Sequence, residues 1–273
     1  FAGEDPAPEA HEVMAVFALD ARDLRSLDAT VKIMAPAVES PWGAASNVTL
    51  IVRVLPPARS NDAVQAEIRL AVDQPRTPWG AATNLQLTAR LEPSLTEPFP
   101  TNGTLRLELL RPRTPWGDAG RFTIDAHTTT LATNPAARLT TITLNAEQLR
   151  TEQGLARSAR VTARITHAAT NLLPASVQSE TMLDQAQTRW ATSAWTRVEA
   201  SFDLPRADDL ALARTNLPWP ERLQNIPFDL TAAFSNALGA QLEWSRLSLT
   251  NRWRWPEFRV AADAQTSAGT LAA

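Results

Sequence analysis

Pro75-Arg76-Thr77-Pro78-Trp79-Gly80 is a six-residue stretch that recurs along the chain at a fixed interval. The same six residues return at 112–117, and a shorter form, Ser-Pro-Trp-Gly, stands at 40–43. The interval is 37 residues, and it relates the tryptophans and the glycines of these stretches: Trp42, Trp79 and Trp116, and Gly43, Gly80 and Gly117. A period of this length is typical of repeat proteins, whose units each bury an apolar face only against their neighbours.

Each Trp-Gly pair is followed by residues that alternate between apolar and polar side chains. Alternation with period two indicates a β-strand with one apolar face and one wet face. The phase is the same in five successive units, which predicts a fixed strand register. The apolar positions in these strands include Val48, Leu50, Val52, Leu85, Leu87, Ile124, Val161 and Val198.

A second alternating strand follows in each unit after a polar, proline-containing loop such as 56–62. Two strands of about ten residues per unit, joined by short loops, predict an antiparallel meander. The apolar positions of the second strands include Ile68, Leu70, Leu105, Leu107, Ile142 and Leu144, and later in the chain Phe228 and Leu230.

The period divides residues 1–273 into one repeat array of seven hairpin units, hence about fourteen strands in an all-β chain. The units lie near 5–41, 42–78, 79–115, 116–152, 153–189, 190–240 and 241–273. The sixth unit keeps its phase only if 14 residues are added, so we interpret 206–225 as an insertion. We expect a short helix over 207–214 within it, followed by a proline-bounded loop.

Composition excludes several classes of site. The net charge of -3 and the absence of any basic cluster argue against nucleic-acid binding, and the chain has no cysteine for a disulfide, zinc site or thiol nucleophile. His11, His127 and His167 occupy unrelated repeat positions, and we find no catalytic triad, phosphate loop or facing carboxylate pair. We therefore expect no enzymatic activity, no metal and no cofactor.

The alternation leaves a long apolar strip with no helical segment able to cover it. Such a sheet must curl over its own apolar face, pair with another layer or hold an apolar ligand. We therefore expect the sheet to curl into a groove whose apolar lining would shield acyl chains. No run approaches 18 apolar residues, and the first residues contain neither an initiator Met nor a basic region. We expect a segment of a longer protein, with any membrane anchor outside it.

The Trp-Gly turns, the strand pattern Asn-Leu-x-Leu-x-Ala-x-Leu over 84–91 and the unit length resemble the AsmA-like superfamily. This superfamily includes the TamB and YhdP branches of bacterial bridge-like lipid-transfer proteins, and the resemblance covers most of 5–265. It implies a curled, taco-like β-groove in the periplasm that guides phospholipids between the two membranes. The implied partners are a phospholipid or other acyl-chain ligand, the rest of a longer chain and membrane proteins of the cell envelope.

Two other interpretations fit the same pattern. The array could be a structural or adhesive scaffold with a closed core and a binding function in its loops. Fourteen alternating strands would also suit an outer-membrane barrel, although the absence of tyrosine and the twenty prolines argue against it. The tryptophans of the turns could either contact lipid at the rim of a groove or simply cap the apolar strip.

Overall fold

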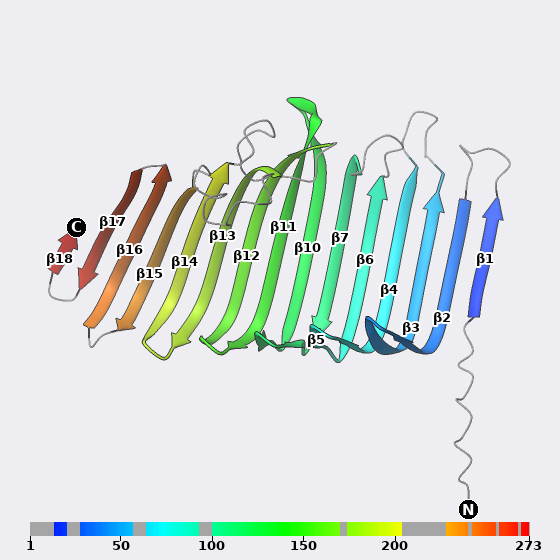
Figure 1. The fold of residues 1–273 in the computed structure, drawn as a ribbon, viewed down its shortest axis with the longest axis horizontal. Helices are drawn as coiled ribbons and strands as arrows, with labels where there is room; N and C mark the ends of the chain where they lie inside the picture. The colour runs from blue at the N-terminus through cyan, green and yellow to red at the C-terminus, as the bar shows by residue number, and fades with distance from the viewer. Residues whose placement is uncertain are drawn as a thin grey trace, which may run out of the picture.

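The computed structural model describes residues 14–20, 28–56, 64–92, 100–169, 174–203, 228–239, 242–254, 257–266 and 269–272. Within these ranges the chain forms strands and turns and no helix, and every strand belongs to one sheet (Figure 1). The predicted all-β architecture is therefore confirmed. The helix expected over 207–214 lies outside the described residues.

Fourteen strands of seven or more residues build the sheet. They are β1 (Met14–Asp20), β2 (Asp28–Ser40), β3 (Gly43–Leu55), β4 (Gln65–Thr77), β6 (Asn84–Glu92), β7 (Asn102–Leu110), β10 (Arg121–Leu131), β11 (Asn134–Thr151), β12 (Gly154–Ala168), β13 (Pro174–Thr188), β14 (Ala191–Asp203), β15 (Phe228–Gly239), β16 (Leu242–Arg254) and β17 (Glu257–Thr266). Four short strands complete it: β5 (Gly80–Ala81), β8 (Arg113–Thr114), β9 (Gly117–Asp118) and β18 (Gly269–Ala272).

The long strands pair antiparallel with their neighbours in chain order, which is the predicted meander. β1 pairs with β2, and the ladder continues through β3, β4, β6, β7 and β10 to β17. Among the described residues, β1 pairs only with β2 and β18 only with β17. The described sheet therefore has two free edges and a long axis that runs across its strands (Figure 1).

The last four residues of the repeated stretch, Thr77 to Gly80, form a tight turn that the Thr77 side chain holds in place. The Thr77 hydroxyl accepts a hydrogen bond from the Trp79 amide (3.2 Å) and donates one to the Gly80 carbonyl oxygen (3.1 Å). The same two bonds form in the turns that begin at Ser40, Thr114, Thr151 and Thr188. Proline suits the second position because its ring fixes the φ angle that the turn requires.

The glycine that ends four of the five turns allows the next unit to approach closely. A Cβ atom at Gly80 would overlap the Arg113 carbonyl oxygen, and the φ angle of Gly80 is 157°. Gly43, Gly117 and Gly154 meet the corresponding carbonyl oxygens of Arg76, Arg150 and Gln187 in the same way. At these four positions only glycine avoids the overlap, whereas the fifth turn has alanine, Ala191, in the same place.

A backbone kink separates the long ladder from the turn in four successive units. Gln74, Arg111, Gln148 and Gln185 all have φ between 48° and 55°, and they stand 37 residues apart. Each such left-handed residue costs roughly 1 kcal/mol. β4 pairs with β6 before Gln74 and with β5 after it, in the same register. The predicted alternation of side chains therefore continues through the kink.

The next kink residue is Asn236, which follows Gln185 by 51 residues instead of 37. The difference equals the 14 residues that the alternation required in the sixth unit. The assignment of these residues to an insertion at 206–225 stays a prediction, since 204–227 lie outside the described residues. Alternation alone does not reveal the kinks, because glutamine and arginine carry no signal for a positive φ angle.

Replacing Gly80 by alanine should destabilise the fold by roughly 2–3 kcal/mol, because the new Cβ would overlap backbone atoms and strain φ. Chemical denaturation of the purified protein measures this change. The control is G103A, where the added Cβ would lie 2.9 Å from the movable end of the Leu91 side chain. Equal costs for the two variants would contradict the proposed stacking role of Gly80.

Asp73, next to the kink at Gln74, should make stability depend on pH. Side-chain hydrogen bonds from Asn47 and Asn84, each 3.0 Å long, lower the pKa of Asp73. Its stabilising contribution is therefore present above the unfolded pKa of about 3.9 and is lost as the pH falls through the lower folded value. Unfolding midpoints of the wild type and D73N should converge below about pH 4. An N47A background should reduce this convergence; an unchanged convergence would contradict the assignment.

Candidate functional site

The first candidate site is the apolar face of the sheet, which the register builds from rows of directly opposed residues. One row crosses thirteen strands, from β2 to β17, and contains a single polar residue, Thr181. In order it comprises Ile33, Leu50, Leu70, Leu87, Leu107, Ile124, Leu144, Val161, Thr181, Val198, Ala232, Leu249 and Ala262.

A second row runs beside the first, two residues away from it on each strand. It comprises Val31, Val52, Ile68, Ala89, Leu105, Ala126, Ile142, Ala163, Ser179, Ala200, Leu230, Asn251 and Val260. Ser179 and Asn251 are its polar members. Opposed side chains of this kind are the unit that stabilises a sheet, so the two rows form one continuous apolar strip.

The remaining predicted lining residues lie on the same face, outside these two rows. Val48 is opposite Ala35, and Leu85 is opposite Val72 and Leu109. Phe228 is opposite Phe202 and Trp253, and its ring stacks on Trp253 with centroids 6.2 Å apart. The structure therefore places all sixteen predicted residues on one face, while their contact with lipid stays a prediction.

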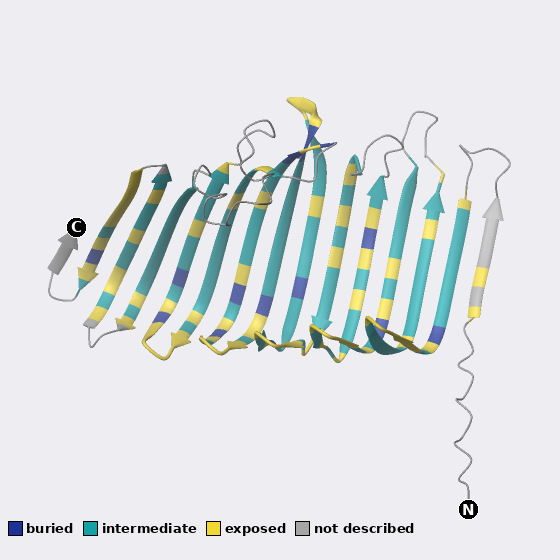
Figure 2. Ribbon diagram, viewed as in Figure 1, coloured by how far each residue is buried: buried dark blue, intermediate teal, exposed yellow. Residues whose placement is uncertain are grey.

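The described part of the chain supplies no second layer over this face. All sixteen predicted residues are partly exposed, and no large side chain among the described residues is fully buried (Figure 2). The most buried apolar residues are nearly all alanines, such as Ala35, Ala89 and Ala146. An ordinary closed core would instead bury its leucines and isoleucines almost completely.

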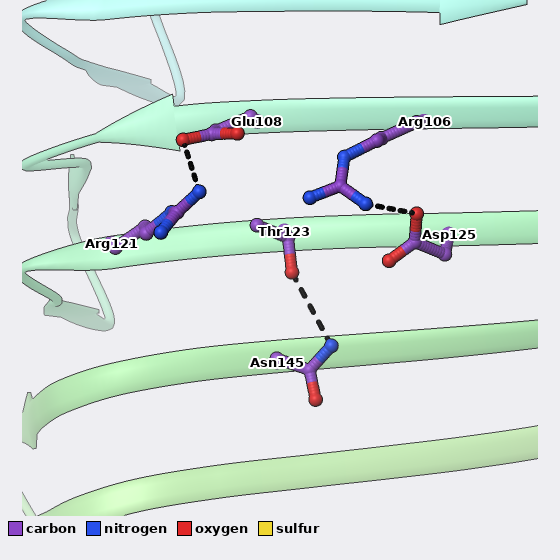
Figure 3. Close-up of polar contacts among 6 residues, drawn as sticks. All are labelled: Arg106, Glu108, Arg121, Thr123, Asp125 and Asn145. Atoms are coloured by element: carbon purple, nitrogen blue, oxygen red, sulfur yellow. Dashed lines mark hydrogen bonds and ion pairs between the residues drawn. The ribbon is translucent and has the colours of Figure 1, made fainter.

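The opposite face of the sheet is polar and rich in ion pairs. Arg106 on β7 lies 3.3 Å from Asp125 on β10, and Arg121 lies 2.7 Å from Glu108 (Figure 3). The charged side chains of these pairs remain a quarter to a half exposed, so each pair contributes little to stability. Open hollows on this face are lined by such charges and by threonines. This is the arrangement of a solvated surface.

A polar cluster that the alternation did not reveal lies where the apolar face meets the loop edge. The Thr128 and Thr140 hydroxyls, opposite each other on β10 and β11, are 3.0 Å apart. The buried His167 on β12 is 3.1 Å from the Thr140 hydroxyl and 3.0 Å from the Ala168 carbonyl oxygen. Hydrogen bonds therefore link the three side chains. Alternation does not predict this cluster, because threonine occurs on either face of a strand.

The second candidate surface is the turn edge, defined by the five turns at 40–43, 77–80, 114–117, 151–154 and 188–191. Its tryptophans are among the most exposed large apolar side chains of the described residues: Trp42 is 71% exposed, Trp79 57%, Trp116 70% and Trp190 61%. Arg189 lies over the Trp190 ring, 4.0 Å from its centroid. Exposed residues gather along this edge in Figure 2. This exposure argues against capping of the apolar strip, and the role of the tryptophans stays a prediction.

Neither candidate surface suggests catalysis. Among the described residues, no group of three or more histidine or acidic side chains could hold a metal ion. The same residues contain no helix long and apolar enough to cross a membrane. His127 lies on the polar face and is exposed.

The comparisons with known proteins leave the family open. No protein-family model, no curated protein and no solved structure matches this chain. The functional argument therefore depends on the surfaces themselves.

Replacing Leu107 by alanine should cost about 1–2 kcal/mol, less than the 2–5 kcal/mol typical of a fully buried leucine. The reason is that the Leu107 side chain is partly exposed on an uncovered face. Denaturant titration of L107A measures the cost, and R106A, on the polar face, should change stability by less than about 0.5 kcal/mol. A loss above about 4 kcal/mol for L107A would show that another layer covers the face.

Proposed function

We propose that this chain is a periplasmic groove segment that shields the acyl chains of phospholipids as they move between the inner and outer membranes. The observation that carries the proposal is the pair of apolar rows that crosses thirteen strands without a second layer in the described chain. A surface of this kind gains about 25 cal/mol for each Å² of apolar area that it removes from water.

An acyl chain is an occupant that matches the shape and chemistry of the strip. Each methylene buried against the rows contributes about 0.8 kcal/mol, and a flexible chain adapts to side chains of unequal size. The strip changes from leucine and isoleucine on β11 to valine, threonine, alanine and serine on β12 to β14, so its lining is not uniform. Phospholipid headgroups would remain in water beyond the strand ends.

The side chains outside the apolar strip support the same function. The wet face carries paired charges, so it stays in solvent while the apolar face holds lipid. The polar cluster of Thr128, Thr140 and His167 adds hydrogen-bonding groups at one border of the strip. The resemblance to AsmA-like proteins favours the same location and the same ligand class. It also favours a longer parent chain and envelope membrane proteins as partners.

Photocrosslinking tests the proposal at two matched pairs of positions. Leu87 and Leu107 are directly opposite each other on the apolar face, and Thr88 and Arg106 are directly opposite each other on the polar face. A photoreactive residue at each position, in cells with labelled phospholipids, should give labelled protein from the apolar pair alone.

Two results would contradict the proposed function. Labelling at neither pair would show that the strip holds no lipid and would favour the closed-core scaffold. Equal labelling at both pairs would show nonspecific contact with membranes. Lipid extraction from the purified protein provides an independent measurement, and lipid-free preparations would also count against the groove.

A further inference from the structure

The exposed indoles of the turn edge are not needed to form the turns. Gln153 occupies the tryptophan position in the fourth turn, where the Thr151 hydroxyl still accepts a bond from the Gln153 amide (3.3 Å) and donates one to the Gly154 carbonyl oxygen (3.1 Å). The turn therefore forms without an indole. Large exposed aromatic side chains that gather on one edge, and that the fold does not require, mark an interaction surface.

The turns and their flanking residues carry more positive than negative charge. The segments 38–46, 74–83, 111–120, 148–157 and 185–194 contain six arginines and three acidic residues, which gives them a net charge of +3. The arginines are Arg76, Arg111, Arg113, Arg150, Arg157 and Arg189, and the acids are Glu39, Asp118 and Glu152. All nine side chains are exposed. The whole chain has a net charge of -3, so positive charge is concentrated on this edge.

Three further acids lie one residue inside these segments, and each has a partner in the ladder. They are Asp73, Glu147 and Asp184. Asp184 pairs with Arg157, Asp73 accepts hydrogen bonds from two asparagine side chains, and Glu147 is directly opposite Arg121. When Arg157 is counted as neutralised, the edge still has five arginines against three acids. An excess of positive charge on an exposed edge attracts an anionic surface.

Three of the arginines lie in one row that the strand register fixes. Arg76 and Arg113 are both opposite Ala81, and Arg113 and Arg150 are both opposite Asp118. Each of these arginines precedes the tryptophan position of its turn by three residues. The pairings that form the row also join successive turns, so guanidinium groups and indoles are held together along the edge before any ligand binds.

We propose that the turn edge docks on an anionic phospholipid bilayer, with its indoles in the headgroup region and its arginines on lipid phosphates. Indole rings are amphipathic and favour the interface between headgroups and acyl chains. Guanidinium groups bind phosphate oxygens through paired hydrogen bonds. The indoles are distributed singly over four turns, whereas a protein partner is normally held by one compact cluster of anchors. A bilayer offers the same contacts at every turn.

The turn edge is separate from the apolar strip, so docking does not require lipid on the strip. Docking over several turns lays the sheet along one membrane, with one end of its strands in the headgroup region. If the strip carries phospholipid, as proposed above, the docked edge is where lipids would enter or leave it without passing through water.

Cosedimentation with vesicles of equal parts phosphatidylglycerol and phosphatidylcholine tests the docking. The protein should bind these vesicles at least about tenfold more tightly than vesicles of phosphatidylcholine alone. Salt at about 0.5 M should remove most of this difference, because it screens exposed charges.

Two variants test the contribution of the indoles. Since glutamine occupies the equivalent position at 153, W79Q/W116Q should fold normally, and it should bind the anionic vesicles about tenfold more weakly or worse. Q153W adds an indole to the fourth turn and should strengthen binding. Thermal unfolding of each variant checks that its fold is unchanged.

Two further variants each remove two positive charges and differ only in where the charges lie. R76Q/R113Q alters the row at the edge and should weaken binding to the anionic vesicles about tenfold or more. R53Q/R164Q alters exposed arginines of the polar face and should change binding by less than about twofold, because salt screens charges that lie far from the bilayer.

A single cysteine label shows which surface meets the bilayer, because the chain has no cysteine of its own. An environment-sensitive fluorophore at Q153C, on the turn edge, should gain fluorescence with anionic vesicles, and the same fluorophore at T88C, on the polar face, should not. A response at L87C with none at Q153C would show that the apolar strip adsorbs to lipid. That result would overturn the docking edge and leave the proposed function standing.

Each of the following outcomes would also overturn the proposal. The protein fails to bind anionic vesicles, or binds both kinds of vesicle equally, or W79Q/W116Q and R76Q/R113Q bind as well as wild type. An equal loss of binding in R53Q/R164Q and R76Q/R113Q would show that net charge alone, and not this edge, governs binding. A smaller oligomer in W79Q/W116Q, without vesicle binding by the wild type, would assign the edge to contacts between copies of this chain.

Discussion

The structure depends on the close contact between each turn glycine and a carbonyl oxygen of the next unit. The glycine lets two successive hairpins approach so closely that a Cβ atom would overlap backbone atoms. The hydroxyl at the start of each turn fixes the same four-residue geometry in all five turns. Together these contacts set the spacing of the units and hold the register of the strands between them.

The constant strand register decides which side chains lie on each face of the sheet. Because opposed residues share a face, an alternating sequence in constant phase sorts its side chains into one apolar and one polar surface. The apolar surface then extends across the described sheet, with polar Thr181 and Ser179 on β13, although no single unit has a core of its own. The cost is an uncovered strip, which a longer chain or a ligand must shield from water.

The three surfaces of the sheet differ in what maintains them. Packing of opposed leucines, valines and alanines maintains the apolar face. The polar face carries exposed ion pairs such as Arg106–Asp125. Hydrogen bonds between successive turns maintain the turn edge, where the indoles project into solvent. The backbone kinks at Gln74 and its equivalents separate this edge from the ladder, so changes in one need not disturb the other.

The sequence by itself determined the repeat period, the strand order and the face of each ladder residue, since all three follow from alternation and spacing. Leu87 and Leu107 could be assigned to one face because period two leaves no other choice. The kink at Gln74, the bonding of His167 to Thr140 and the exposure of the indoles could not be assigned in this way. Each depends on which residues of distant strands meet, and only the folded sheet brings those residues together.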